Sequence, residues 1–248
     1  MARRDPTRLV AIIQARMGST RLPGKILMPL GSATVLEHVI GRVRRSQVFD
    51  EVCVATTEHN VDDRVAKLAS SAGAVVARGS EQDVLGRYGL AAQATGATAI
   101  ARITSDCPLI DPVVLAAMAR EFLGGGADLV TNARIRTFPR GLDAEIFTRD
   151  ALDIMLREAH EPHQREHVTP FLYEHPQRFR IVDHRNAVDA SQFRLTLDTA
   201  DDYELLQRIF ATAPAEQLTL DSVVALLRSR PDLALLNAHV QQKTAAGR

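Results

Sequence analysis

The sequence has few cysteines, no long apolar run and no excess of charge of either sign. The two cysteines, Cys53 and Cys107, lie far apart without the paired spacing of a zinc site or a redox motif, so we expect buried free thiols. No apolar run approaches the length of a membrane span, and residues 1–8 lack the hydrophobic segment of a signal peptide. These absences predict a cytoplasmic protein with no membrane partner.

The charges balance, with 30 Lys and Arg residues against 30 Asp and Glu residues. Nothing in this balance attracts the chain as a whole to nucleic acid, so any preference for a charged ligand must arise locally. The 248 residues are 46% hydrophobic and 24% charged, which suits a soluble globular protein with a sizeable core. We expect one domain over residues 1–240 and a frayed polar tail over residues 241–248.

Strand-like apolar segments alternate with helical patterns along the first half of the chain. The strands are expected at residues 9–15, 51–55, 74–77, 98–104 and 128–132, and helices at 62–71, 84–94 and 112–123. A further helix is expected after Thr34, a candidate N-cap. This alternation predicts an α/β fold with a mostly parallel twisted sheet flanked by helices.

The rhythm changes after Asn132, and such a change often marks a substrate-specific insertion, here residues 132–183. Within it we expect alternation over residues 142–147 and helices at 149–159 and 164–173. Beyond it we expect strands at residues 179–183 and 193–197 and helices at 200–210 and 222–229.

The loop after the first expected strand has the composition of a phosphate-binding loop. It reads Ala-Arg-Met-Gly-Ser-Thr-Arg-Leu-Pro-Gly-Lys over residues 15–25. Its glycines allow close backbone approach to a ligand, and Arg16, Arg21 and Lys25 supply positive charge. A Walker A loop is excluded, because five residues separate Gly18 from Gly24 and an isoleucine follows Lys25.

These residues resemble the signature of the nucleotide-sugar cytidylyltransferases, the group of the CMP-KDO and CMP-sialic acid synthetases, and most of all its SpsF-like branch. The resemblance implies a single-domain nucleotide-diphospho-sugar transferase fold, which is Rossmann-like and of glycosyltransferase-A type. It also implies that Arg16, Ser19 and Lys25 contact CTP, with Arg21 at the phosphates. A second segment, Arg-Gly-Ser-x-x-Asp-Val-Leu-x-Arg from Arg78 to Arg87, matches the same branch and is expected to line the base or ribose.

The nucleotide contacts expected from the loop, this second segment and the turn after residue 104 are Ala15, Arg16, Gly18, Ser19, Lys25, Arg78, Ser80 and Ser105. Two residues of the second segment have plainer interpretations as well. Ser80 has the residue type of a helix N-cap, and a solvated helix position would equally explain Arg87.

Two aspartates are predicted to hold Mg²⁺. Asp106 follows the buried strand at residues 98–104, and Asp198 follows residues 193–197, so both lie where open α/β sheets bind ligands. Mg²⁺ prefers a few carboxylates together with phosphate oxygens and water. The resemblance supports both: Asp198, Thr199 and Asp202 match an Asp-Thr-x-x-Asp turn, and Asp106 matches a mid-chain turn in which Cys107 replaces a glutamate. Asp111, before a proline, is expected to be a helix N-cap.

The acceptor is expected to contact Arg140, Asp143, Glu145 and Arg165. Alternation places Asp143 and Glu145 on one strand face, opposite Leu142 and its apolar neighbours, where they would bind sugar hydroxyls, a second metal ion or only solvent. A similar Pro-x-Gly-x-Asp-x-Glu run in SpsF-like chains supports an acceptor role for Asp143 and Glu145. A Glu-x-Val-Thr-Pro run after an arginine also occurs in those chains, and it implies packing or acceptor contacts for Arg165, Glu166 and Thr169.

The resemblance implies a Mg²⁺-dependent cytidylyltransferase that joins CMP from CTP to a small acidic acceptor, with Arg16, Arg21 and Lys25 as catalytic residues. The acceptor would be an acidic sugar such as a nonulosonate or KDO-like acid. The resembling enzymes commonly form dimers, for which the apolar segment at residues 138–147 is a candidate surface. Four alternatives stay open: a glycosyltransferase, transfer to a phosphonate, a non-catalytic nucleotide-binding module, and a zinc protease using the His163-x-x-Glu-His167 pattern near His160.

Overall fold

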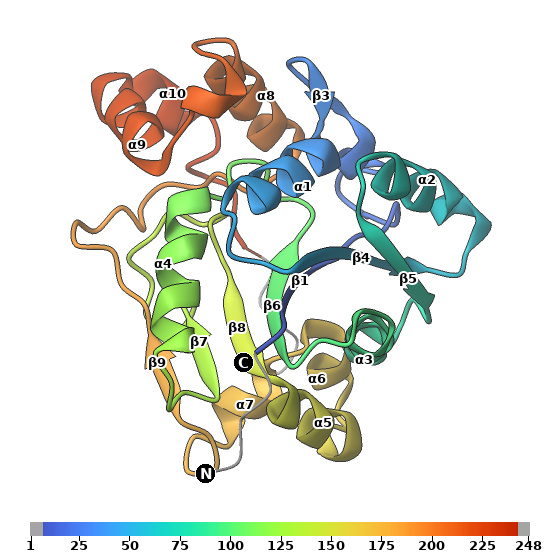
Figure 1. The fold of residues 1–248 in the computed structure, drawn as a ribbon. Helices are drawn as coiled ribbons and strands as arrows, with labels where there is room; N and C mark the ends of the chain where they lie inside the picture. Colours follow the sequence, from blue (N-terminus) through green and yellow to red (C-terminus); the bar gives the residue numbers. More distant parts are fainter. Residues whose placement is uncertain (1–6, 243–248) are drawn as a thin grey trace.

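A seven-stranded sheet forms the centre of the computed structural model, which describes residues 7–242. Its order is β5-β4-β1-β6-β8-β7-β9, and β8 runs antiparallel to both of its neighbours while the other pairs are parallel (Figure 1). The strands are β1 (Leu9–Gln14), β4 (Glu51–Thr57), β5 (Val75–Gly79), β6 (Ala99–Thr104), β7 (Leu129–Thr131), β8 (Glu145–Thr148) and β9 (Ile181–Asp183). The mostly parallel α/β fold predicted from the sequence is confirmed.

Helices cover both faces of the sheet, so the central strands read as continuous apolar runs. One face packs against α1 (Val35–Arg45), α2 (Asp63–Ser71), α4 (Pro112–Leu123), α8 (Ala200–Phe210), α9 (Leu220–Ser229) and α10 (Pro231–Leu235). The other packs against α3 (Val84–Thr95), α5 (Arg149–Glu158), α6 (Pro162–His167) and α7 (Pro170–Glu174) (Figure 1). Within β1, Ile13 enters the first core and Ile12 the second, and both are fully buried.

Capping side chains fix where several helices begin. Thr34 and Glu37 form a reciprocal capping box at α1, and Asp111 accepts hydrogen bonds from the backbone N–H groups of Val113 and Val114 at α4, as predicted. At α3 the cap is Asp83 and not Ser80. Both cysteines are buried free thiols, which confirms that prediction. A short hairpin of β2 (Pro29–Leu30) and β3 (Ala33–Thr34), and 3₁₀ turns at η1 (Lys25–Leu27), η2 (Asn60–Asp62) and η3 (Ala215–Gln217), complete the chain.

The helix expected over residues 164–173 is two helices, α6 and α7. Val168 adopts a left-handed backbone with φ of 73°, which a β-branched residue rarely does, and Pro170 begins α7 without a backbone N–H group. The chain therefore turns between His167 and Pro170.

Residues 193–197, which were expected to form a strand, are not part of the central sheet. This segment is extended but makes only an isolated parallel bridge, between Arg140 and Arg194. The N–H of Leu195 donates to the Arg140 carbonyl at 2.6 Å, and that of Leu197 to the Asp106 carbonyl at 2.8 Å. Gly141 makes this approach possible: its φ is 105°, and a Cβ there would lie 2.5 Å from the Thr196 nitrogen. The segment thus joins two loops at the sheet edge.

The apolar side chains at residues 138–147 do not form a surface for a second subunit. Phe138, Leu142, Ile146 and Phe147 are each at most 2% exposed and belong to the cores of a single chain. The predicted dimer surface at this segment is therefore wrong, because the sheet and its helices already bury it. Residues 132–183 also supply β8 to the central sheet, so this part of the chain belongs structurally to the main domain.

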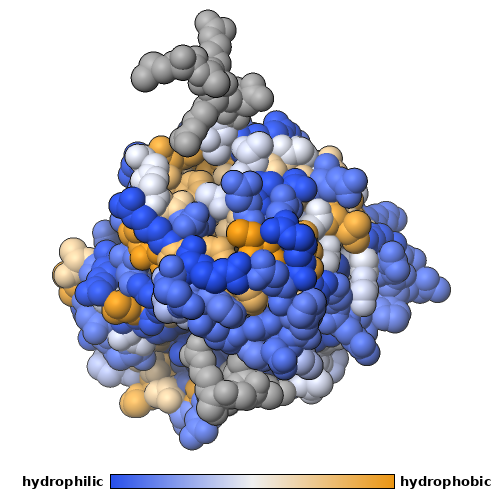
Figure 2. Space-filling view, turned by 90° about the horizontal axis from the view of Figure 1, so that it is seen from below, coloured by the Kyte–Doolittle hydropathy of each residue, from blue (hydrophilic) through white to orange (hydrophobic). Residues whose placement is uncertain are grey.

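The surface seen from the lower end of Figure 1 is mostly hydrophilic, with apolar residues in separate patches (Figure 2). Among residues 7–242 no helix is both long enough and apolar enough to cross a bilayer. Of the predicted tail, Gln241 and Gln242 are described and residues 243–248 lie outside the described residues.

Candidate active site

The carboxyl ends of β1, β4, β5 and β6 meet at one edge of the sheet, since these strands are parallel. The loop after β1 folds around one carbonyl: the N–H groups of Ser19 and Gly24 both donate to the Met17 oxygen, at 2.9 and 3.2 Å. Gly24 has a φ of 71°, and the Met17 N–H donates to Asp62 at 2.6 Å. These bonds bring Lys25 back across the sheet edge at the start of η1.

Lys25 joins the two aspartates predicted to hold metal. Its Nζ lies 2.7 Å from Asp106 Oδ2, 2.8 Å from Asp198 Oδ1 and 2.6 Å from the Leu197 carbonyl oxygen. The Lys25 side chain is only 11% exposed. Residues from three distant parts of the chain therefore meet around one ammonium group.

The electrostatics of this cluster favour the charged forms. Burial lowers the pKa of Lys25, but the charges of Asp106 and Asp198 outweigh it and raise that pKa above 10.5. Burial raises the pKa of Asp198, but Lys25, Arg194 and Arg21 together lower it below 3.8. Near neutral pH these groups are an ammonium and a carboxylate.

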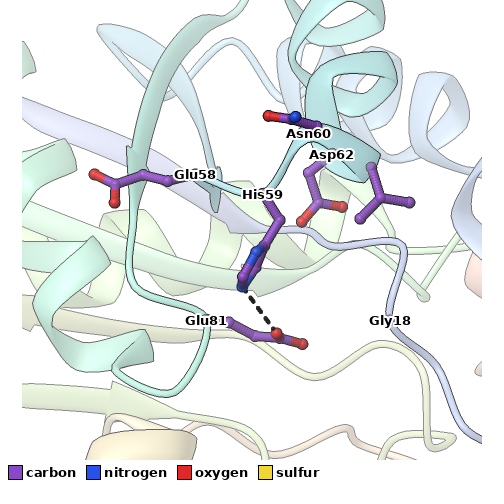
Figure 3. A pocket seen from close by; sticks show the side chains of 7 residues that line it. Gly18, Glu58, His59, Asn60, Asp62 and Glu81 are labelled. Atoms are coloured by element: carbon purple, nitrogen blue, oxygen red, sulfur yellow. Dashed lines mark ion pairs between the residues drawn. The ribbon is translucent and has the colours of Figure 1, made fainter.

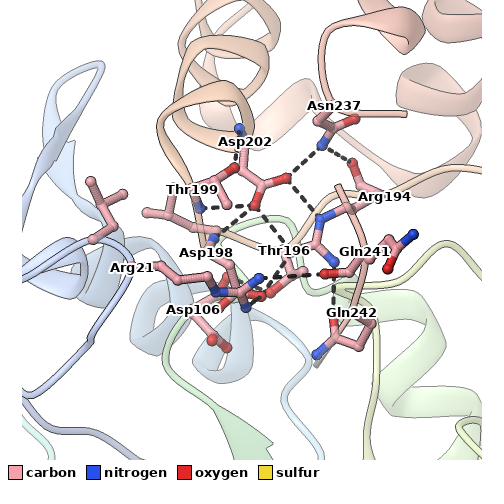
Figure 4. Close-up of polar contacts among 12 residues, drawn as sticks. Arg21, Asp106, Arg194, Thr196, Asp198, Thr199, Asp202, Asn237, Gln241 and Gln242 are labelled. Carbon is pink, nitrogen blue, oxygen red and sulfur yellow. Dashed lines mark hydrogen bonds and ion pairs between the residues drawn. The ribbon is translucent and has the colours of Figure 1, made fainter. Parts of the chain in front are cut away.

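Two arginines hold the other oxygen of Asp198. Arg21 Nη2 lies 2.9 Å and Arg194 Nη2 2.8 Å from Asp198 Oδ2. Arg194 also contacts Asp202, which is fully buried and accepts a hydrogen bond from Asn237 at 2.7 Å (Figure 4). Figure 4 shows these side chains converging from the 194–199 segment, α8 and the chain after α10.

A cavity of about 410 Å³ opens beside the cluster. It brings together most of the predicted site residues. Those lining it are Ala15, Arg16, Gly18, Ser19, Arg21, Lys25, Ser105, Asp106 and Asp198. The phosphate-loop cations and the two aspartates thus face one space.

A second cavity of about 600 Å³ adjoins the first at Gly18 and is lined by the turn after β4 (Figure 3). Glu81 stands between them: it contacts Arg16 Nη1 at 2.6 Å and His59 Nε2 at 3.2 Å. Arg78 and Ser80 line neither cavity. Arg78 instead donates to the Thr57 and His59 carbonyl oxygens and pairs with Asp63, which joins β5 to the turn after β4.

The four residues predicted to contact an acceptor lie outside the lining of the first cavity. Glu145 is 2% exposed and is held by Arg102 at 2.6 Å, by Thr169 at 2.8 Å and by Tyr173. The prediction that Glu145 could face solvent is therefore wrong, because α7 covers the face of β8 opposite Ile146.

The remaining three differ in their partners. Asp143 pairs with Arg136, and Arg165 reaches Asp83 at the start of α3. Arg140 is half-buried, which lowers its pKa, and its charge interacts with those of Asp143 and Asp198. Arg140 is thus electrostatically coupled to the carboxylate cluster.

Six further residues line the first cavity. Gln14, Thr20 and Thr104 were not considered as site residues, whereas Arg87, Glu166 and His167 lie in segments that the sequence had singled out. Arg87 is 2% exposed and donates to the Ser80 and Glu81 carbonyl oxygens, while its Nε has no partner among the described atoms. Burial lowers the pKa of His167, which keeps the imidazole neutral. Arg194 was also missed, although alternation along the extended segment already places Arg194, Thr196 and Asp198 on one side.

The donor set around Lys25 fits a divalent cation. Two carboxylate oxygens and a backbone carbonyl oxygen converge on one cationic group, and Mg²⁺ prefers such oxygens completed by phosphates and water. Within residues 7–242 no group of three or more His, Cys, Asp or Glu side chains is arranged to hold a metal ion. His163, in the H-x-x-E-H pattern, contacts Glu174 at 2.6 Å.

Comparison with known proteins identifies similar chains along almost the whole length. A family model described as cytidylyltransferase matches residues 10–244. The spore coat polysaccharide biosynthesis protein SpsF of Bacillus subtilis is 35% identical over 91% of this chain and 96% of its own. The 3-deoxy-manno-octulosonate cytidylyltransferase of Myxococcus xanthus is 35% identical over 56% of this chain and 53% of its own. A solved cytidylyltransferase from Leptospira borgpetersenii superposes with a TM-score of 0.90 at 36% identity, over 96% of this chain and 100% of that one.

Proposed function

The chain belongs to the cytidylyltransferase family, and on that premise we propose that it transfers CMP from CTP to an acidic sugar with release of pyrophosphate, assisted by Mg²⁺. Membership of this family argues against the three alternatives of a glycosyltransferase, a non-catalytic nucleotide-binding module and a zinc protease. The name of the Myxococcus xanthus relative, a 3-deoxy-manno-octulosonate cytidylyltransferase, supports an acidic sugar as the acceptor.

One observation carries the proposal: Lys25 of the phosphate loop lies between Asp106 and Asp198 at the edge of the nucleotide cavity. A triphosphate in this cavity would meet Arg16, Arg21 and Lys25, and phosphate oxygens bind such charge-assisted donors strongly. A bound divalent cation would be held by Asp106 and Asp198, and its chemistry there is to neutralise phosphate charge as a Lewis acid.

The reaction needs few groups beyond these. An acceptor hydroxyl oxygen attacks the α-phosphorus of CTP and gives up its proton to the solvent. The bond from that phosphorus to the oxygen bridging the α- and β-phosphates breaks, and pyrophosphate leaves with that oxygen. Negative charge grows on the leaving group, and Arg16, Arg21 and Lys25 are the groups whose charge offsets it. The protein contributes chiefly orientation and electrostatic stabilisation.

The acceptor side is assigned by proximity and charge. Glu166 and His167 line the cavity from α6, and they offer a carboxylate and a neutral imidazole for sugar hydroxyls. Arg140 lies outside the lining of this cavity, but its backbone pairs with residues 193–195 of the segment that leads to Asp198, and it would supply a cation for an acceptor carboxylate. We therefore propose Arg140, Glu166 and His167 as acceptor contacts, and assign Glu145 and Arg165 to packing.

The test is nucleotide-dependent thermal stabilisation followed by pyrophosphate release. We expect CTP with Mg²⁺ to raise the melting temperature more than UTP, ATP or GTP, because ligand that binds only the native state stabilises it. With CTP bound, acidic sugars are then compared with a phosphonate for pyrophosphate release.

Stabilisation by another nucleotide instead of CTP would contradict the proposed donor. Pyrophosphate release with the phosphonate but with no acidic sugar would keep the donor and overturn the acceptor class. Matched neutral sugars are the control, and they should release no pyrophosphate.

A further inference from the structure

The two oxygens of the Asp198 carboxylate have different partners. Oδ1 faces Lys25 and Asp106, while Oδ2 receives Arg21 and Arg194. The backbone N–H of Asp198 donates to Asp202 Oδ2 at 2.9 Å. Asp198 is thus held by two arginines through Oδ2 and by Asp202 through its backbone, while Oδ1, the oxygen that Lys25 contacts, is directed at the predicted metal position.

Arg194 is the group that connects these two contacts. It is 8% exposed, and its fork binds Asp202 twice, through Nε at 2.8 Å and Nη2 at 3.0 Å, while Nη2 also reaches Asp198. A lysine would keep the charge but could not reproduce this planar two-carboxylate geometry. The direction of Asp198 therefore depends on the orientation of one guanidinium group.

Asn237, in the chain after α10, fixes that orientation. It is 2% exposed, and its amide nitrogen donates to Asp202 Oδ1 at 2.7 Å and to the Arg194 carbonyl oxygen at 3.1 Å (Figure 4). Gln242 adds a contact to Arg194 Nη1 at 2.7 Å. The capping box between Thr199 and Asp202 already begins α8. The contact of Asn237 with the Arg194 carbonyl oxygen and that of Arg194 with Asp198 are not part of this cap.

We propose that Arg194, Asp202 and Asn237 form a positioning unit for Asp198, through which the chain after α10 sets the affinity of the active site for a divalent cation. This proposal rests on the proposed function, which makes Asp198 a metal ligand. Groups that orient a ligand from behind typically change metal affinity by about 10-fold to 100-fold when they are lost.

The experiment measures Mn²⁺ binding in the presence of CTP, from the electron paramagnetic resonance signal of free Mn²⁺. Asn237→Ala and Arg194→Lys should each weaken Mn²⁺ binding by about 10-fold to 100-fold. CTP binding without metal should change less than about twofold, because neither side chain lines the nucleotide cavity. Raising the Mn²⁺ concentration should restore pyrophosphate release, which a purely structural defect would not allow.

Arg208→Ala is the matched control, since it removes an exposed ion pair with Glu204 from the same helix as Asp202 without touching Asp198. It should bind Mn²⁺ like the native protein. Asn237 is buried, so Asn237→Ala is the variant that is at risk of impaired folding. Gln242→Ala removes only the outer contact to Arg194 and provides a second test, and it should weaken Mn²⁺ binding by less than Asn237→Ala does.

Equal Mn²⁺ affinity in the native protein, Arg194→Lys and Gln242→Ala would overturn the positioning unit while leaving the proposed function intact. Failure of the native protein to bind CTP would instead overturn the proposed function. Weaker Mn²⁺ binding in Arg208→Ala as well would also overturn the proposal, because the effect would then not be specific to the contacts around Asp198.

Discussion

At the scale of single residues, Lys25 has two roles, one as the partner of Asp106 and Asp198 and one in the loop after β1. Its ammonium group pairs with Asp106 and with Oδ1 of Asp198, and under the proposed function its position in the loop after β1 would make it a phosphate ligand as well. A metal ion and the lysine therefore compete for the same oxygens unless phosphate draws the lysine away.

Replacing Lys25 by Ala separates these two roles. We expect turnover to fall about 100-fold or more, because a charged group that stabilises the leaving pyrophosphate is lost. In the same variant Asp106 and the Oδ1 oxygen of Asp198 lose their ammonium partner, while Arg21 and Arg194 still hold Oδ2. Mn²⁺ without CTP should therefore raise the melting temperature of this variant more than that of the native protein.

Differential scanning fluorimetry with and without Mn²⁺ measures the second effect. The Arg208→Ala protein provides a baseline, since its exposed ion pair lies away from the two aspartates. An identical Mn²⁺ shift in the native protein and Lys25→Ala would mean that the lysine does not shield the carboxylates.

At the scale of elements, β8 is joined to its neighbours by charge as well as by backbone pairing. Glu145 begins this strand opposite Arg102 of β6, and Thr169, the N-cap of α7, and Tyr173, within α7, both donate to it. The side chains of Arg102 and Glu145 are only 16% and 3% exposed, so water has little access to either charge.

Glu145→Gln should therefore destabilise the protein without weakening acceptor binding. Loss of the carboxylate leaves the Arg102 guanidinium buried without its partner, and such a change costs about 3–5 kcal/mol. Urea denaturation measures this loss, and the KM for the acceptor in the folded fraction should stay within about twofold of the native value. Asp143→Asn, which removes a part-exposed pair with Arg136, should cost less than about 1 kcal/mol.

A large rise in the acceptor KM with little change in the denaturation midpoint would reverse this assignment. Glu145 would then be an acceptor contact, as the strand alternation suggested.

At the scale of the whole molecule, the buried acids predict how stability depends on pH. Burial raises the pKa of Asp202, but Arg194 and Asn237 lower it by more, and Asp198 is shifted in the same direction. Both native pKa values lie below the ordinary value of 3.8, so the unfolded chain binds more protons at low pH.

The free energy of unfolding should therefore be insensitive to these two groups well above pH 4 and should fall as the pH drops below about 4. Urea midpoints between pH 6 and pH 3 measure the effect. The fall should be shallower in Arg194→Lys, because that variant lowers the two native pKa values less. An equally steep fall in both proteins would show that other carboxylates control acid unfolding.

Much of the architecture follows from patterns in the sequence. The apolar runs before residues 15, 57 and 104 predict central strands because they are buried on both faces, and the rule that ligands bind at strand carboxyl ends predicts that Asp106 and the loop after β1 meet. Asp198 was found by the same rule even though its segment pairs with two loops and not with the sheet.

The parts that the sequence did not predict depend on long-range packing. Val168 interrupts the expected helix with a positive φ of 73°, which β-branched residues rarely adopt, so the local sequence does not predict the turn. Glu145 has the spacing of an exposed acid but is covered by α7. Asn237 has no motif at all, and its role is visible only where the folded chain brings it to Arg194.

The contact of Asn237 also has a consequence for a chain in the course of synthesis. β1, β4, β5 and β6 can pair once about 104 residues are available, whereas Asn237 acts on Asp202 and Arg194 from 35 and 43 positions further along the chain. The ribosome adds 133 residues between Thr104 and Asn237, which takes about 7–27 seconds at roughly 5–20 residues per second. A nascent chain thus passes through a period in which these four parallel strands are complete but Asn237 cannot yet contact Asp202 and Arg194.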